Sequence, residues 1–350
     1  MAGPLLWLSR WRRRHRELPP LLGGADTRLR AEREAEMLRW SVKVLGSEMA
    51  ERRYAAGLAG PEAELPEQPV AVGLTSRTCR QADIEHAWLR HWCGQLRMAP
   101  MYHRKPWEDC FVLQALWEAG MLQPGRRALG FAVGQEAIPA YLAARGLEVV
   151  ATDLDPADAR ARDWIRTGQH SAARDRLFRP DLVDRAEFER LVTFRPADMT
   201  RIPEDLLGGG FDVVWSVCAL EHLGTLERGL DFVCAAMRCL RPGGIAVHTT
   251  EYNLDNAGGT VRRGSTVLYQ RRHLEGLAAR LAAAGHAMAP LEDAPGEGLM
   301  DRYVDLPPFA AEGEGSPLGA LAPPHLRLSI RGYPVTSAGI LVTAGGSGGA

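Results

Sequence analysis

The chain has 350 residues, 46% hydrophobic and 24% charged, which is enough to bury the core of one large or two modest domains and excludes a wholly disordered chain. Its formal net charge is -1, so no overall positive field attracts nucleic acid or an acidic membrane, and we expect no nucleic-acid partner. The six cysteines form no C-x-x-C pair, which argues against a zinc ribbon or a disulfide framework and favours reduced thiols in a cytoplasmic protein.

The first residues form a basic arm. Residues 10–16 contain five arginines, and the arm is apolar first and basic second, the reverse of a secretory signal. No apolar run approaches the roughly 18 residues of a membrane-spanning helix. Trp7 and Trp11 would allow peripheral contact with an anionic membrane surface, whereas a solvated tail is the simpler prediction.

Helical composition dominates the first third of the chain. Residues 27–54 are rich in Ala, Glu, Arg, Leu and Met and predict a helix. Prolines then predict a linker, and two tryptophan-containing helices are expected after it, at 76–98 and 106–121. We divide this region into an arm with its helix at 1–60, a linker at 61–75 and a helical lead-in at 76–125.

From residue 126 the pattern changes to short apolar strands that alternate with helices, which is typical of a parallel sheet with helical crossovers. The predicted strands are 128–131, 148–152, 190–195, 211–217 and 244–249, followed by two closing strands at 326–330 and 338–343. This predicts an α/β fold at 126–343: a Rossmann-like seven-stranded sheet, mostly parallel with an antiparallel last strand, helices on both faces and a helical N-terminal extension.

Two stretches interrupt this alternation, at 156–189 and at 290–324. Insertions near the carboxyl ends of strands are where an α/β enzyme builds its substrate site, so we expect both on the substrate side of the core. Residues 344–350 are predicted to be a flexible tail.

The turn after the first predicted core strand reads GFAVG, from Gly130 to Gly134. Glycines at such a turn let backbone approach a ligand, and the following helix offers free N–H groups. Asp153 ends the next strand, where a carboxylate suits ribose hydroxyls. A dinucleotide fingerprint would need G-x-G-x-x-G, and Ala132 and Gln135 fit that spacing badly. The pattern therefore indicates a nucleoside-containing cofactor other than a dinucleotide.

The segments RALGFAVGQE, VVATDLDP, FRPADM, FDVVWSVCALEHLG and CLRPGGIAVHTTEYN occur in this order. Their succession resembles class I S-adenosylmethionine-dependent methyltransferases, and in particular bacterial members of uncertain substrate with a Trp-rich helical lead-in and an H-T-T-E segment. The resemblance implies S-adenosylmethionine as cofactor. It implies cofactor contacts from the residues Gly130, Gly134, Asp153, Asp198, Met199 and Ser216. Two departures are Ala128, where the class carries an acid, and Ala132, where it carries a glycine.

Methyl transfer to an alcohol or phenol needs alignment of the reactants and a base that takes the acceptor's proton. His222, directly after Glu221 at the end of the fourth predicted core strand, is the first candidate, although a histidine that merely starts a helix would look the same. His248 and Glu251, near the end of the fifth predicted core strand, are second candidates, and a buried structural role is the alternative for His248. His170, in the first insertion, is either part of a lid or an exposed loop residue.

A metal-assisted reaction is a weaker alternative. Some related methyltransferases place E-x-x-E-H here as ligands of a divalent ion, but Cys218 replaces the first acid. A soft thiol makes a poor magnesium site, so the sequence predicts no metal.

The sequence thus predicts O-methylation of a small-molecule or carbohydrate-type acceptor. Two rivals stay open: a non-catalytic Rossmann-like scaffold that binds a partner, which Ala128 and Ala132 favour, and a nicotinamide-dependent oxidoreductase, which the glycine spacing disfavours. The sequence leaves the oligomeric state open, although the helix at 27–54 would allow pairing with a second copy.

Overall fold

The structure of the chain is a computed structural model that describes residues 24–54, 65–166, 168–208, 210–307, 309 and 323–346. The predicted basic arm before residue 24, part of the predicted linker, most of the second half of the insertion at 290–324 and the end of the tail lie outside the described residues.

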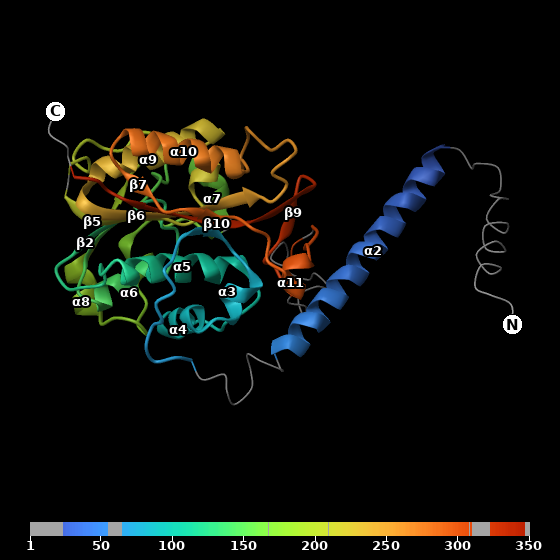
Figure 1. The fold of residues 1–350 in the computed structure, drawn as a ribbon, viewed down its shortest axis with the longest axis horizontal. Coiled ribbons are helices and arrows are strands. Elements are labelled where there is room, and N and C mark those ends of the chain that lie inside the picture. The colour runs from blue at the N-terminus through green and yellow to red at the C-terminus, as the bar shows by residue number, and fades with distance from the viewer. Residues whose placement is uncertain are drawn as a thin grey trace, which may run out of the picture.

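A ten-stranded sheet forms the centre of the described fold, with the strand order β4-β3-β2-β5-β6-β10-β1-β8 and with β7 and β9 paired to β10 (Figure 1). The strands are β1 (Ser76–Thr78), β2 (Arg127–Gly130), β3 (Glu148–Asp153), β4 (Val192–Pro196), β5 (Phe211–Ser216), β6 (Leu240–Asn253), β7 (Ala287–Met288), β8 (Leu291–Glu292), β9 (Leu328–Ile330) and β10 (Tyr333–Thr343). Strands β4, β3, β2, β5 and β6, which are neighbours in the sheet, run parallel, and β10 is antiparallel to β6. The predicted α/β class and its antiparallel last strand are therefore confirmed.

Helices cover both faces of the sheet (Figure 1). They are α2 (Gly24–Arg53), α3 (Gln81–Glu85), α4 (Ala87–Gln95), α5 (Arg104–Glu118), α6 (Ile138–Ala144), α7 (Arg162–Arg166), α8 (Arg185–Leu191), α9 (Leu226–Ala236), α10 (Arg271–Ala283) and α11 (Leu299–Arg302). Short 3-10 turns are Ala159–Ala161, Arg174–Leu177, Leu220–His222 and Met237–Cys239.

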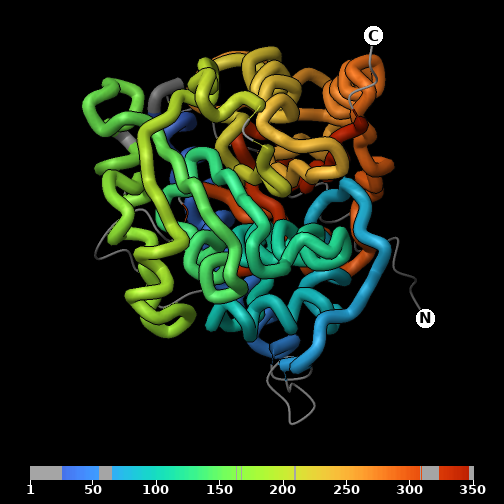
Figure 2. Tube along the Cα trace, turned by 90° about the vertical axis from the view of Figure 1, so that its left-hand side faces the viewer, coloured from blue at the N-terminus to red at the C-terminus, as the bar shows by residue number. Residues whose placement is uncertain are grey.

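Alternate residues of β5 enter two separate apolar layers, because successive side chains of a strand point to opposite faces. Val213 and Trp215 belong to the layer with the tryptophans of α4 and α5, and Val214 belongs to the layer with α9 and α10. A strand buried on both faces explains why this segment reads as a continuous apolar run. Figure 2 shows the red β10 passing between the early helices and the late ones.

The lead-in differs from its prediction at its beginning. Residues 76–78 form β1, which pairs antiparallel with β10 and parallel with β8, instead of the start of a helix over 76–98. The rest of that segment divides at His86, whose extended backbone ends α3 and whose side chain accepts a hydrogen bond from the Trp88 N–H to begin α4. With β1, β7 and β8, the described sheet has ten strands rather than the seven predicted.

Helix α2 extends away from the core along much of its length (Figure 1). Its later turns dock through Lys43, whose buried ammonium lies 2.5 Å from Asp305 Oδ1, and through Gly46, where a Cβ would overlap the Tyr303 ring. Leu38 and Leu45 on its apolar face are 67% and 63% exposed. Within the described ranges, no helix is both long and apolar enough to cross a membrane.

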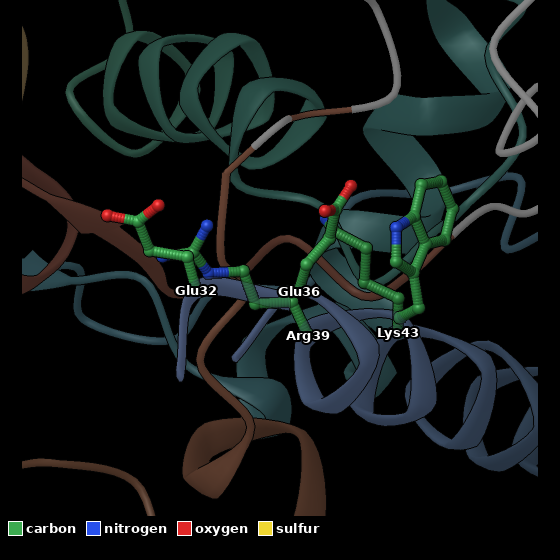
Figure 3. A pocket seen from close by; sticks show the side chains of 5 residues that line it. Glu32, Glu36, Arg39 and Lys43 are labelled. Carbon is green, nitrogen blue, oxygen red and sulfur yellow. The ribbon is translucent and has the colours of Figure 1, made fainter. Parts of the chain in front are cut away.

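A cavity of about 260 Å³ lies along one face of α2 (Figure 3). Its lining residues are Glu32, Glu36, Arg39, Trp40 and Lys43. None of them belongs to the glycine turn or to the ends of the central strands, so this cavity is separate from the candidate active site described next.

Candidate active site

The glycine turn follows β2 directly, at the carboxyl edge of the parallel strands. A Cβ on Gly130 would overlap the Trp215 ring, and a Cβ on Gly134, which has φ +50°, would lie 2.5 Å from the Gln169 carbonyl oxygen. Both positions therefore require glycine. Ala132 adopts φ +49°, a strained conformation for a residue with a side chain. The turn keeps the backbone path of a glycine-rich loop despite this substitution.

Asp153 lies beside this turn, as the sequence predicted. Its carboxylate accepts hydrogen bonds from the backbone N–H of Leu154 at 2.8 Å and of Ser171 at 3.0 Å. Burial raises the pKa of Asp153, and these backbone donors offset part of the rise. Thr152 donates to the Gly130 carbonyl at 2.8 Å, which ties β3 to the end of β2.

Asp198 and Met199 follow β4, next along the same edge. Asp198 Oδ2 lies 2.7 Å from Arg160 Nη2, and Oδ1 accepts from Thr200. Burial alone would raise the pKa of Asp198, but the hydrogen bonds from Arg160 and Thr200 lower it. Met199 is buried. Arg160 belongs to the predicted insertion at 156–189, so the insertion contacts a residue that the resemblance assigns to the cofactor.

The same insertion covers the glycine turn. The Gln169 carbonyl lies against Gly134, and Gln135 Nε2 donates to the Gly168 carbonyl at 2.5 Å. Farther along the edge, the Trp164 ring stands edge-on to His222, with 4.5 Å between ring centroids. His170 is buried and hydrogen-bonds to the Leu154 carbonyl at 2.7 Å. The insertion therefore lies over this edge of the sheet.

Glu221 and His222 follow β5 in a 3-10 turn. Glu221 is fully buried, and its Oε2 accepts a hydrogen bond from Thr250 Oγ1 at 3.0 Å, whereas Oε1 has no partner among the described residues. His222 Nδ1 lies 2.7 Å from the Ser265 carbonyl, which can only accept, so Nδ1 carries the proton. His222 Nε2 is left with a lone pair and lies 3.8 Å from Glu221 Oε1.

His248 and Ser216 are cross-strand neighbours in β6 and β5. Their side chains hydrogen-bond at 2.8 Å between Nδ1 and Oγ, and the histidine ring packs edge-on to Phe232 in the layer with α9. Burial lowers the pKa of His248 to about 3, so the ring is neutral at physiological pH. This environment fits a residue that holds Ser216 in place.

A buried charged cluster joins this edge from α5, and the sequence interpretation missed it. Arg104 pairs with Glu251 at 2.6 Å and with Glu108 at 3.1 Å, and Glu108 also accepts from Cys218 Sγ at 3.0 Å and from Ser337 Oγ. Burial alone would raise the pKa of Glu108, but Lys105 and Arg104 lower it. The only signal in the sequence was an Arg and a Glu four residues apart at the start of a helix, which is typical of a solvated helix face.

A family model for the methyltransferase domain matches residues 129–248. This match identifies residues 129–248 as a methyltransferase domain. The matched range begins one residue before Gly130 and ends at His248, so it contains both the glycine turn and the Glu221–His222 pair.

No curated protein sequence matches the methyltransferase. Among solved structures, a candidate sarcosine dimethylglycine methyltransferase from Galdieria sulphuraria is similar at 14% identity and TM-score 0.41, over 68% of this chain and 87% of that chain. An amino pentose methyltransferase from Micromonospora echinaspora is similar at 17% identity and TM-score 0.37, over 68% of this chain and 91% of that chain. Both TM-scores are below 0.5, so neither likeness indicates the acceptor.

Proposed function

We propose that the chain transfers a methyl group from S-adenosylmethionine to an oxygen of a small-molecule or carbohydrate-type acceptor. The observation that carries the proposal is the Glu221–His222 pair, which sits at the carboxyl end of β5 with a free Nε2 lone pair and a buried carboxylate 3.8 Å away. A base in this place suits a hydroxyl acceptor, because an alcohol must lose its proton during methylation.

The residues of the glycine turn fit the cofactor. Gly130 and Gly134 let the turn pack directly against Trp215 and the Gln169 carbonyl, and Asp153 ends β3 with an acceptor for ribose hydroxyls. Ala128 lacks the acid that the class carries, but Glu136 supplies a carboxylate at the same turn, held by Trp215 Nε1 at 3.0 Å. We assign Glu136 to the ammonium group of the methionine part, and Asp198, Met199 and Ser216 to the remaining cofactor contacts.

When bound, the cofactor supplies an already activated methyl group, so the protein has to align the reactants, exclude water and move one proton. His222 Nε2 takes the proton of the acceptor hydroxyl, and the adjacent Glu221 carboxylate stabilises the imidazolium that results. Trp164, which covers His222, keeps water away. His248 acts by holding Ser216 at the end of β5.

Calorimetric titration with S-adenosylhomocysteine, with NAD as the control ligand, tests the cofactor half of the proposal. We expect saturable binding of S-adenosylhomocysteine alone, and at least a 100-fold loss of affinity in Asp153→Ala but not in Asp155→Ala, an exposed aspartate two residues away. Binding of NAD instead would support the oxidoreductase alternative. Binding of neither ligand would support the non-catalytic scaffold.

Transfer of a labelled methyl group to sugars and phenols, compared with amines, tests the acceptor half. We expect methylation of hydroxyl acceptors, and a loss of about 10²–10⁴-fold in turnover for His222→Gln with unchanged S-adenosylhomocysteine affinity, as for a general base. Methylation of amines alone, or full turnover by His222→Gln, would contradict O-methylation with His222 as base.

A further inference from the structure

A group of metal-ligand side chains lies directly beside His222. Cys218, Glu221 and Glu251 each offer one ligand atom, and these atoms all lie within 4.8 Å of one another. The two carboxylates are buried, at 0% and 5% exposure. Ligands of one tetrahedral zinc ion stand about 3.4–3.7 Å apart, as follows from Zn–O of about 2.1 Å and Zn–S of about 2.3 Å. Side-chain movements of about 1 Å would therefore bring the three atoms around one ion.

Each carboxylate has one anchored oxygen and one free oxygen. Glu221 Oε2 accepts from Thr250, and Glu251 Oε1 is held by Arg104 Nη2 at 2.6 Å. Glu221 Oε1 and Glu251 Oε2 are buried without a hydrogen-bond partner in the part of the chain that the structure describes. Metal-binding carboxylates have this arrangement, in which a second group orients one oxygen and leaves the other for the ion.

The cluster also carries an excess of negative charge that a cation would balance. Among the described residues, two basic side chains face Glu108, Glu221 and Glu251: Arg104 pairs with Glu251 and Glu108, and Lys105 Nζ lies 3.1 Å from Glu108. Three carboxylates and two cations leave one excess negative charge, and a thiolate at Cys218 would make two. A divalent ion balances them, and the Cys218 thiol, which donates to Glu108 at 3.0 Å without the ion, loses its proton when it binds one.

We propose that Cys218, Glu221 and Glu251 bind a zinc ion and leave its fourth coordination position open toward His222. The sulfur ligand selects zinc over magnesium, which prefers oxygen ligands alone. The expectation of no metal, drawn from the sequence, considered magnesium only. Three protein ligands and one open position are the pattern of catalytic rather than structural zinc.

The role of the ion rests on the proposed function. An acceptor hydroxyl at the open position becomes more acidic. It loses its proton to His222 Nε2, and its oxygen forms the bond to the methyl carbon while the carbon–sulfur bond breaks. The electron pair of that bond stays on sulfur, which neutralises the sulfonium, and His222 passes the proton to water.

The test is calorimetric titration of the chelator-treated full chain with zinc chloride. We expect one ion per chain, and at least tenfold weaker binding in Glu251→Gln and Cys218→Ser. Two matched controls should bind as the wild type does: Glu292→Gln, another glutamate paired with arginines, and Cys234→Ser, another partly buried thiol. Thr250→Val, which removes only the anchor of Glu221, should weaken binding about 10–100-fold.

Cobalt(II) provides a readout that needs no variant. Bound to Cys218, it should give a sulfur-to-cobalt charge-transfer absorption, and cobalt binding without that absorption would overturn the proposal even if a variant fails to fold. The absence of stoichiometric zinc binding, or equal losses in the control variants, would also overturn it. S-adenosylhomocysteine titration of the same sample reports on the proposed function separately, so a chain that binds S-adenosylhomocysteine but no zinc contradicts the metal site alone.

Discussion

His248 contributes a pH-dependent part of the stability. Its pKa in the folded protein is about 3, because it is fully buried, and its ordinary value is 6.5. Between these values the unfolded chain takes up a proton that the folded chain does not, so this contribution is complete above pH 6.5 and is lost as the pH falls toward 3.

We therefore predict that this residue alone lowers the free energy of unfolding by about 1.4 kcal/mol per pH unit below pH 6.5. Urea denaturation of the wild type and of His248→Asn at several pH values measures the difference in slope. The exposed His86, changed to Asn, is the control, because asparagine retains the helix cap. Parallel curves for wild type and His248→Asn would contradict the prediction.

The buried Lys43–Asp305 pair joins α2 to the rest of the molecule. Both side chains are 1% exposed, and Asp305 is also held by His325 Nδ1 at 2.8 Å. Because Lys43→Met leaves the carboxylate without its cation, we predict a destabilisation of about 3–5 kcal/mol, limited by the free energy with which α2 docks.

Urea denaturation measures this loss, and limited proteolysis should show α2 cleaved early in Lys43→Met. Adding Asp305→Leu to this variant should restore much of the stability, since no buried charge is then left unpaired. Arg28→Ala, in an exposed ion pair of the same helix, should change stability by less than about 1 kcal/mol. Equal effects of Lys43→Met and Arg28→Ala would contradict the role of the buried pair.

The insertion contacts three parts of the proposed cofactor site, through Arg160, Trp164 and Ser171. We predict that S-adenosylhomocysteine slows amide hydrogen exchange at residues 168–173 at least fivefold, because a ligand under this segment fixes it. Helix α10, whose buried face packs in the layer with α9, serves as the internal control. Unchanged exchange at 168–173, or equal slowing in α10, would show that the insertion does not act as a cover.

Local pattern was enough to predict the parallel core but not the additions to it. Strands β2 to β6 contain apolar runs, which a strand buried in a sheet requires wherever in the sheet it lies. β1 and β8 have three and two residues, and they are strands only because β10 and each other lie beside them. Such pairings join segments far apart in the chain, and no local periodicity marks them.

The residues of the candidate site also fall into those that local sequence predicted and those that only tertiary packing brings together. Gly130 and Asp153 end strands and Glu221 lies in the turn after one, so position alone predicted them, and the structure places all three at one edge of the sheet. The cluster around Arg104 was missed because its partners come from distant segments: Ser337 lies 233 residues from Arg104 in the chain. Whether such an arginine is solvated or buried depends on tertiary packing, which its neighbours in sequence do not reveal.

At the scale of the whole molecule, the early and late parts of the chain are packed against each other. Arg77 of β1 pairs with Gly339 of β10, and the ring of Phe111 in α5 would overlap a side chain at Gly339. The lead-in helices therefore pack over a surface that includes β10, a strand from the late part of the chain (Figure 2).

This arrangement sets the order of events during synthesis on the ribosome. At about 5–20 residues per second, roughly 13–50 s pass between the emergence of β1 and that of the strand it pairs with. During this time the tryptophans of α4 and α5 lack part of the surface that buries them, while the parallel strands already have their neighbours. The segment made early thus completes its packing only after β10 has emerged, and until then part of its aromatic surface stays exposed to water.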